Sequence, residues 1–281
     1  MLSEFFFTEQ HAQYYEVAQD YSFVLVLVSY VIAVFAAFVS FYVVERVIAA
    51  PSAAVRWRWL TTGAATMGAG IWSMHFSGMM ALEMPAWICG NADGNVHYNV
   101  PLTVLSAVFA MLASGSAFYF VSKRSKSFGL LLTAGVILGA GIGLMHYTGM
   151  AAMEMHAIVR YDILWFSASI VAAVVLASYA LWQMSYTLEA RAQDRSDNRG
   201  VAALIMGLAI TLMHYAGMAA TKFLVPTGQQ TDAPLGGIAL DGMVVGIAIT
   251  GFAVLVLGMA LFAASKEEQR QAKSVTEPQQ S

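Results

Sequence analysis

Three histidines of this chain occur in the same short motif, and imidazole is a common metal ligand and proton carrier in proteins. In each copy the histidine follows a methionine, precedes an aromatic residue, and is followed by a glycine three residues later and a methionine four residues later. The copies occupy residues 74–79, 145–150 and 213–218. Each histidine also has a glycine seven residues before it and an isoleucine four residues before it. The match therefore predicts one arrangement of side chains built three times.

The spacing within the motif places the histidine and the second methionine on one face of a helix. A helix turns by about 100° per residue, so positions −7, −4, 0, +3 and +4 relative to the histidine form one stripe. The candidate metal ligands on this stripe are His75, His146, His214, Met79, Met150 and Met218. The methionine directly before each histidine points about 100° away from it, which favours a packing role.

Imidazole and thioether together form a ligand set suited to copper, because soft sulfur selects Cu(I) and imidazole binds both oxidation states. Zinc on the three histidines and haem between two of them are the competing interpretations. Six candidate ligands exceed what one copper ion uses, so the pattern predicts a subset of them or more than one ion. The glycines have a simpler interpretation, because small residues let membrane helices pack closely.

The composition indicates a membrane protein. The chain is 59% hydrophobic and 11% charged, with a mean hydropathy of +0.65, whereas an ordinary soluble domain has roughly 25% charged residues. Charged residues leave seven gaps long enough for a transmembrane helix. These gaps are residues 21–44, 59–82, 94–122, 127–153, 163–188, 200–221 and 242–265. We predict an all-α membrane protein with seven transmembrane helices, in which an ionisable histidine inside a span is a functional residue by default.

The basic residues predict the orientation in the membrane. Twelve of the 14 Lys and Arg residues fall in the odd-to-even connections and after the seventh span, and only Arg160 and Lys222 fall on the other side. The positive-inside rule then places the N-terminus outside and the C-terminus in the cytoplasm. Residues 1–20 contain no basic residue and so lack the positive region of a cleaved signal peptide. We expect an extracytoplasmic tail over 1–20, a membrane domain over 21–265, and a short cytoplasmic tail over 266–281.

The motifs divide the membrane domain into three repeats. Each repeat is one descending and one ascending helix in the same orientation, and the seventh helix has no motif partner. Parallel repeats of this kind are expected to surround an axis along the membrane normal. The three motifs would then lie at one depth in the outer leaflet, where their histidines can converge. The turn-rich loop over 83–101, which contains the single Cys89, could fold over the first motif as a cap.

Other functions find less support in the sequence. The basic residues are spread over four short loops, where orientation accounts for them, so nothing indicates nucleic-acid binding. No phosphate-binding loop, activated nucleophile or intramembrane carboxylate pair is evident, and we predict that the protein is not an enzyme. A copper or small-molecule transporter is the alternative, but the cytoplasmic halves of the spans offer only scattered Ser, Thr and Tyr for a path. A scaffold whose glycine faces serve only packing is a third interpretation.

Residues 145–148, Met-His-Tyr-Thr, carry the literal signature of the MHYT domain family, and the other two copies resemble its degenerate forms. The resemblance covers essentially residues 21–265. It implies a bacterial inner-membrane sensor that holds copper through the histidines and neighbouring methionines near the outer face and senses oxygen, carbon monoxide or nitric oxide. Many members of the family continue into a cyclic-di-GMP synthase, phosphodiesterase or kinase domain. Because this chain stops at Ser281, either its signal passes to a separate cytoplasmic or membrane partner, which we expect, or signalling is not its function.

Overall fold

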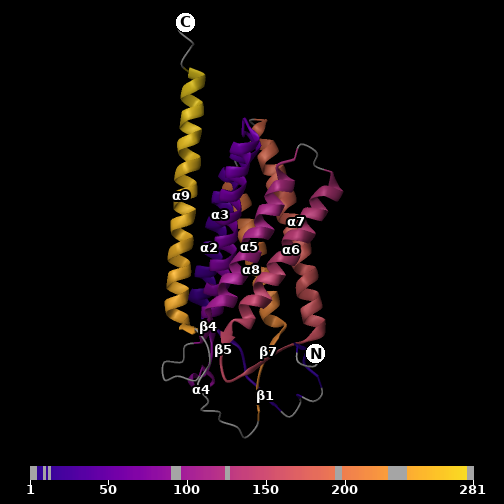
Figure 1. The fold of residues 1–281 in the computed structure, drawn as a ribbon. Coiled ribbons are helices and arrows are strands. Elements are labelled where there is room, and N and C mark those ends of the chain that lie inside the picture. Colours follow the sequence, from indigo (N-terminus) through magenta and orange to yellow (C-terminus); the bar gives the residue numbers. More distant parts are fainter. Residues whose placement is uncertain are drawn as a thin grey trace.

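The computed structural model describes residues 5–8, 11, 14–89, 96–123, 127–193, 198–226 and 239–276, and seven long helices dominate these segments (Figure 1). The helices are α2 (Phe23–Ile48), α3 (Ala53–Met80), α5 (Val100–Val121), α6 (Phe128–Ala151), α7 (Ile163–Ala192), α8 (Arg199–Ala219) and α9 (Gly242–Thr276). Each predicted span coincides with one of them. The helix α9 continues past residue 265 through the first part of the predicted tail, and residues 277–281 lie outside the described part.

Six of these helices are long and apolar enough to cross a membrane, which makes the chain a multi-pass membrane protein by helix composition. The exception is α3, which holds the first motif and is rich in glycine, serine and threonine. Its motif half is buried without interruption from Thr66 to Met79, between α2, α5 and α9. A helix surrounded by protein needs less apolar surface than one facing lipid, which accounts for its lower hydropathy.

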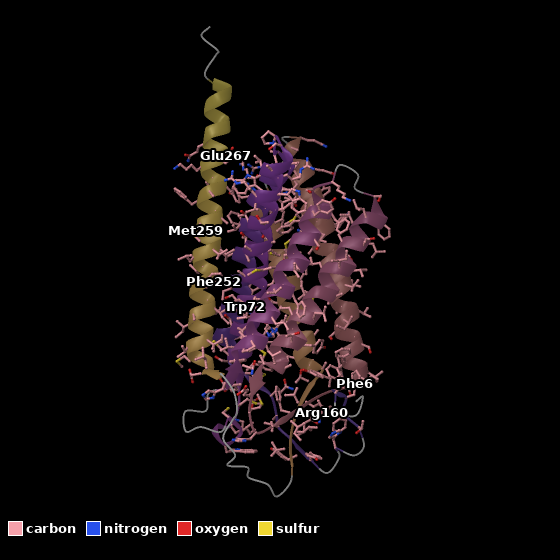
Figure 2. All side chains as sticks on the ribbon, in the orientation of Figure 1. Phe6, Trp72, Arg160, Phe252, Met259 and Glu267 are labelled. Carbon is pink, nitrogen blue, oxygen red and sulfur yellow. The ribbon has the colours of Figure 1, made fainter. Side chains whose placement is uncertain are left out.

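Six helices form a closed ring in the order α2, α3, α5, α6, α7, α8, with α8 packed against α2. The motif helices α3, α6 and α8 alternate with the others and also contact one another. The helix α9 lies outside the ring against α3 and α2, along one edge of the bundle in Figure 1. Its side chains Phe252 and Met259 are exposed along this edge (Figure 2). The core is therefore threefold in plan, and α9 breaks the symmetry.

Glycines determine how closely neighbouring helices of the ring approach each other. A Cβ atom added to Gly68, Gly139 or Gly207, seven residues before each histidine, would meet backbone atoms of α5, α7 or α2 at 2.6 to 2.8 Å. Real side chains do not tolerate such a distance, so glycine is required for the approach of each motif helix to its neighbour. The structure confirms the packing role predicted for these three glycines.

Short antiparallel strands cover the motif end of the bundle, and the sequence analysis did not predict them. They form three sheets in the order β1-β7-β6, β2-β3 and β5-β4-β8. The strands are β1 (Tyr14–Glu16), β2 (Asp20–Tyr21), β3 (Leu82–Glu83), β4 (His97–Asn99), β5 (Met153–Glu154), β6 (Ile158–Tyr161), β7 (Thr221–Pro226) and β8 (Ala239–Asp241), and a short helix α4 (Ala86–Cys89) joins them. Strands this short carry no readable alternation of apolar and polar residues, so their pairing is visible only in the folded chain.

The strands define the structural repeat. In each repeat a strand leads into one helix, the motif helix returns, and a second strand pairs with the first. The three units are β2-α2-α3-β3, β4-α5-α6-β5 and β6-α7-α8-β7. The strand after each motif helix begins seven residues beyond the histidine, at Leu82, Met153 and Thr221. The predicted unit of one descending and one ascending helix thus corresponds to a closed structural module.

Candidate metal centre

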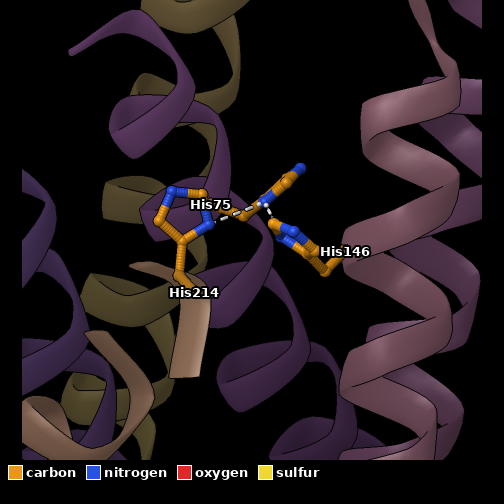
Figure 3. Close-up of side chains that lie close together, drawn as sticks. All are labelled: His75, His146 and His214. Carbon is orange, nitrogen blue, oxygen red and sulfur yellow. Dashed lines mark hydrogen bonds between the residues drawn. The ribbon is translucent and has the colours of Figure 1, made fainter. Parts of the chain in front are cut away.

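The three motif histidines meet at the centre of the ring (Figure 3). The Nδ1 atom of His75 lies 3.1 Å from Nδ1 of His214 and 3.3 Å from Nδ1 of His146. All three side chains are buried, and each comes from a different motif helix. The convergence that the repeat symmetry predicts is therefore present.

A second glycine in each motif makes room for the rings. The Nε2 side of His75 lies against Gly149, that of His146 against Gly217, and that of His214 against Gly78. A Cβ atom at any of these glycines would collide with the imidazole. Each motif helix therefore supplies one histidine and the space for the histidine of its neighbour. This interlocking fixes the direction of the rings and turns all three Nδ1 atoms inward.

The donor set fits a metal ion. Two nitrogen ligands at about 2.0–2.1 Å from one ion in tetrahedral geometry are about 3.3–3.4 Å apart, close to the observed Nδ1 separations of 3.1 and 3.3 Å. Each neutral imidazole offers one lone pair, and three such lone pairs directed at one point attract a cation. The buried triad of His75, His146 and His214 could therefore hold a metal ion.

The methionines occupy two positions relative to this centre. A cavity of about 20 Å³ touches all three histidines, and its wall includes Met74, Met145 and Met213, for which the sequence predicted packing. Met79, Met150 and Met218 are buried, but among the described residues they are not part of this wall. Met79 lines a separate cavity near β4 and α9. Four residues along a helix correspond to about 6 Å, which carries the second methionine away from the rings toward the strands.

An aromatic layer lies between the histidines and the strands. The residue after each histidine packs edge-on against a strand tyrosine: Phe76 on Tyr98 at 5.2 Å, Tyr147 on Tyr161 at 5.0 Å, and Tyr215 on Tyr21 at 5.6 Å between ring centroids. Burial raises the pKa of Tyr98, Tyr161 and Tyr21 above the ordinary value, so these phenols stay neutral. The layer separates the triad from the strand-covered surface.

Sequence reasoning missed these tyrosines, although a signal was present. Each strand tyrosine directly precedes the N-cap residue of a helix, namely Ser22, Asn99 or Asp162. Asn99 and Asp162 accept hydrogen bonds from backbone N–H groups of the first turn, as N-caps do. A tyrosine before a capping residue, repeated once per module, marks this layer in the sequence.

Other polar and ionisable residues of the strand-bearing end lie outside the triad. Cys89 is buried in α4 and is a free thiol, and burial raises its pKa. Glu154 accepts a hydrogen bond from Asn99 Nδ2 at 3.1 Å, and Glu83 lies in β3 just after the end of α3. His11 is hydrogen-bonded to Thr8 through its Nδ1 atom. These contacts belong to the strand-bearing end and not to the histidine centre.

Comparison with known proteins also finds three repeats, with different boundaries. The family described as MHYT, bacterial signalling protein N terminal repeat, matches residues 68–134, 139–194 and 207–276. The chain belongs to the MHYT family. Each match begins at the glycine seven residues before the motif histidine, so the family repeat joins a motif helix to the helix that follows it. The strand pairing instead joins each motif helix to the helix before it, and α2, not α9, closes the ring beside α8.

Curated relatives are signalling proteins. The chain is 35% identical to the bifunctional diguanylate cyclase/cyclic di-GMP phosphodiesterase MucR of Pseudomonas aeruginosa over 240 residues, which is 85% of this chain and 33% of MucR. It is 33% identical to the cyclic di-GMP phosphodiesterase NbdA of the same organism, over 89% of this chain and 30% of NbdA. The signaling protein YkoW of Bacillus subtilis is 35% identical over 62% of this chain and 21% of its own length. The chain spans about a third or less of these relatives, and no solved structure matches it.

Proposed function

We propose that this chain is a membrane sensor module that holds copper on His75, His146 and His214 and responds to a diatomic gas such as oxygen, carbon monoxide or nitric oxide. The observation that carries the proposal is the inward convergence of three Nδ1 atoms in an otherwise apolar core. A bound metal supplies an electrophilic centre for a small ligand. The protein supplies the orientation of the imidazoles and the exclusion of water. No chemical conversion is needed for this role, and we propose that the module is not an enzyme.

We favour copper over zinc because three methionines line the same cavity as the imidazoles. The cavity-wall residues Met74, Met145 and Met213 are soft donors, which stabilise Cu(I). The ligands predicted from the helix stripe are Met79, Met150 and Met218. Leucine variants at Met145 and Met150 compare the two positions within one motif, because leucine keeps the volume and removes the sulfur. We expect Met145→Leu to weaken Cu(I) binding more than Met150→Leu, as measured by competition with a Cu(I) chelator.

We propose that the motif end faces outward in a bacterial inner membrane. We also propose that α3 crosses the membrane together with the six apolar helices, which gives seven spans. The 12 to 2 distribution of Lys and Arg supports this orientation. Reporter fusions at residue 123 and at the end of α9 are expected to report the cytoplasm, and a fusion in the 83–101 segment is expected to report the outside. A cytoplasmic signal from the 83–101 fusion would reverse the orientation.

We propose that the output is a change in a cytoplasmic or membrane signalling partner, or in a signalling domain of the kind named in the relatives. The similarity to MucR and NbdA supports this class of output, because both relatives are described as enzymes that act on cyclic di-GMP. A gas shifts a conformational equilibrium only by its differential affinity for two states. In this proposal the helices move against one another at the glycine-mediated contacts, since these depend on close packing and not on fixed hydrogen bonds.

Metal analysis of the purified chain tests the proposal. We expect copper to bind with a stoichiometry of about one ion per chain. We also expect the optical or electron paramagnetic resonance spectrum to change on addition of nitric oxide or carbon monoxide. A chain that binds stoichiometric zinc or haem and no copper would contradict the metal assignment. Copper binding with a spectrum that no gas alters would contradict gas sensing and favour copper handling or transport.

A further inference from the structure

The three repeats differ three residues before the motif histidine, where Trp72, Gly143 and Thr211 stand. In the first repeat the indole N–H of Trp72 donates to Ser106 Oγ at 3.0 Å and reaches the Thr103 carbonyl oxygen at 3.2 Å. The large ring therefore fills the interface between α3 and α5, deep in the bundle (Figure 2). At the same position of the second repeat, Gly143 places no side chain in the corresponding interface between α6 and α7.

The cavity at the triad extends toward this interface and is also lined by residues of α3 and α8. On the α7 side its wall is formed by Ser169, Ile170 and Ala173, and on the α6 side Gly143 and Tyr147 contribute. Among the described residues, α2 and α5 provide none of the wall. Its volume of about 20 Å³ accommodates the centre of one water-sized molecule, which is also the size class of a diatomic gas. Within the part of the chain that the structure describes, the space for a small ligand beside the triad therefore lies on the α6–α7 side and not on the side of α2 and α5.

Helix packing does not explain Gly143. A Cβ atom at Gly139, one turn away, would meet the Val174 backbone at 2.7 Å, so that glycine is required for the α6–α7 approach. A Cβ atom at Gly143 would meet only Ile170 Cδ1, at 2.9 Å. That atom is the tip of a flexible side chain and can move aside. What the missing side chain at Gly143 provides is the cavity.

The wall of the cavity contains one hydrogen-bonded pair of hydroxyl groups. The Tyr147 and Ser169 oxygens are 2.6 Å apart, and Ser169 donates its own proton to the Phe166 carbonyl oxygen at 2.7 Å. Since a serine hydroxyl has one proton, Tyr147 is the donor in the shared bond. An oriented phenol dipole in an apolar wall acts strongly on any molecule bound next to it, because the local dielectric is low.

We propose that this cavity, on the α6–α7 side of the triad, is the subsite for a single diatomic ligand of the triad, with Gly143 providing its room and the Tyr147–Ser169 pair its polarity. Trp72 fills the equivalent interface of the first repeat, which limits where the ligand can bind. The inference rests on the proposed function, because it assumes a metal on the three histidines.

Carbon monoxide added to the copper(I)-loaded full chain in detergent tests the subsite, with the infrared C–O stretch as the signal. Gly143→Ala places a methyl group in the cavity, and we expect it to weaken carbon monoxide binding about tenfold or more while copper content stays that of the unmodified chain. Gly129→Ala is the matched control, since it lies on the same helix and its added Cβ would meet nothing within 4 Å. Carbon monoxide affinity is expected to be unchanged in this control.

Tyrosine variants locate the ligand independently of affinity. Tyr147→Phe removes the hydroxyl from the cavity wall and is expected to shift the C–O band, whereas Tyr215→Phe, at the same position of the third motif, leaves it in place. Equal carbon monoxide affinity in Gly143→Ala and the unmodified chain, or equal band shifts in the two tyrosine variants, would overturn the subsite and leave the proposed function intact. Loss of copper in Gly143→Ala would also overturn it, by making the cavity part of the metal centre. An unmodified chain that holds no copper would overturn the proposed function itself.

Discussion

The two ends of the helical bundle bury polar side chains in opposite ways. At the motif end the cluster consists of three imidazoles, one from each repeat, arranged with threefold regularity. At the other end Glu45 of α2 pairs with Arg191 of α7 at 3.0 Å and with Arg199 of α8 at 3.4 Å. The Arg199 guanidinium also lies over the Tyr42 ring, 4.0 Å from its centroid. One end holds imidazoles that converge on one point, and the other holds one carboxylate shared between two guanidinium groups.

This difference separates a binding site from a structural contact. The ion pairs of Glu45 join α2 to α7 and α8, and removing the shared carboxylate would leave two like charges at this contact. In the triad, Nδ1 of His75 lies within hydrogen-bond distance of Nδ1 of His146 and of His214, so the imidazoles are partners of one another, and a cation would be shared by all three lone pairs. Changes at the motif end should therefore affect ligand binding, and changes at the charged end should affect stability.

The largest expected effect comes from removing a triad histidine. His146→Ala leaves two of three imidazoles, and we expect copper affinity to fall by at least about 100-fold, because ligand loss exceeds the 10–100-fold typical of outer-shell changes. Helical content should be preserved. His156→Ala, near the strands and outside the triad, is the control and should retain copper. Copper content equal in both variants, measured by elemental analysis after gel filtration, would show that the triad does not hold the metal.

A smaller effect, on stability, is expected at the charged end. Glu45→Gln leaves two guanidinium groups without their shared carboxylate, and we expect it to destabilise the fold by about 2–4 kcal/mol with copper binding unchanged. Glu16→Gln breaks the more exposed pair with Lys222, at 2.8 Å, and should cost under about 1 kcal/mol. Unfolding in a denaturing detergent series measures both. Copper loss in Glu45→Gln without loss of stability would contradict the assignment of metal binding to the motif end and of a structural role to the charged end.

A smaller effect than at Glu45 is expected between the two ends, at the glycines that bring neighbouring helices of the ring into close contact. Gly139→Ala forces α6 and α7 apart, and we expect it to destabilise the fold by about 1–3 kcal/mol. Gly129→Ala has open space around it and should be neutral or stabilising by up to about 1 kcal/mol, because alanine favours a helix. Equal melting temperatures for the two variants would argue that the ring does not depend on this close approach.

The sequence by itself determined the helices, the repeats and the histidine face. Helical periodicity is local, so the spacing from glycine to histidine to glycine defines one stripe without knowledge of any neighbour. Threefold repetition then implies equivalent depth, and the convergence of His75, His146 and His214 followed from it. The packing glycines at −7 were also readable, since close approach of helices needs small residues whatever the partner.

Only the tertiary structure decided which residues surround the histidines. The cavity lies level with the histidines, so its wall includes Met145 and not Met150, and no local pattern specifies where the neighbouring helices leave this space. The strand tyrosines, the opening at Gly143 and the cluster at Glu45 each join residues that are distant in the chain. Such contacts depend on the order of helices in the ring, because the environment of a side chain is set by the neighbouring helices and not by its own.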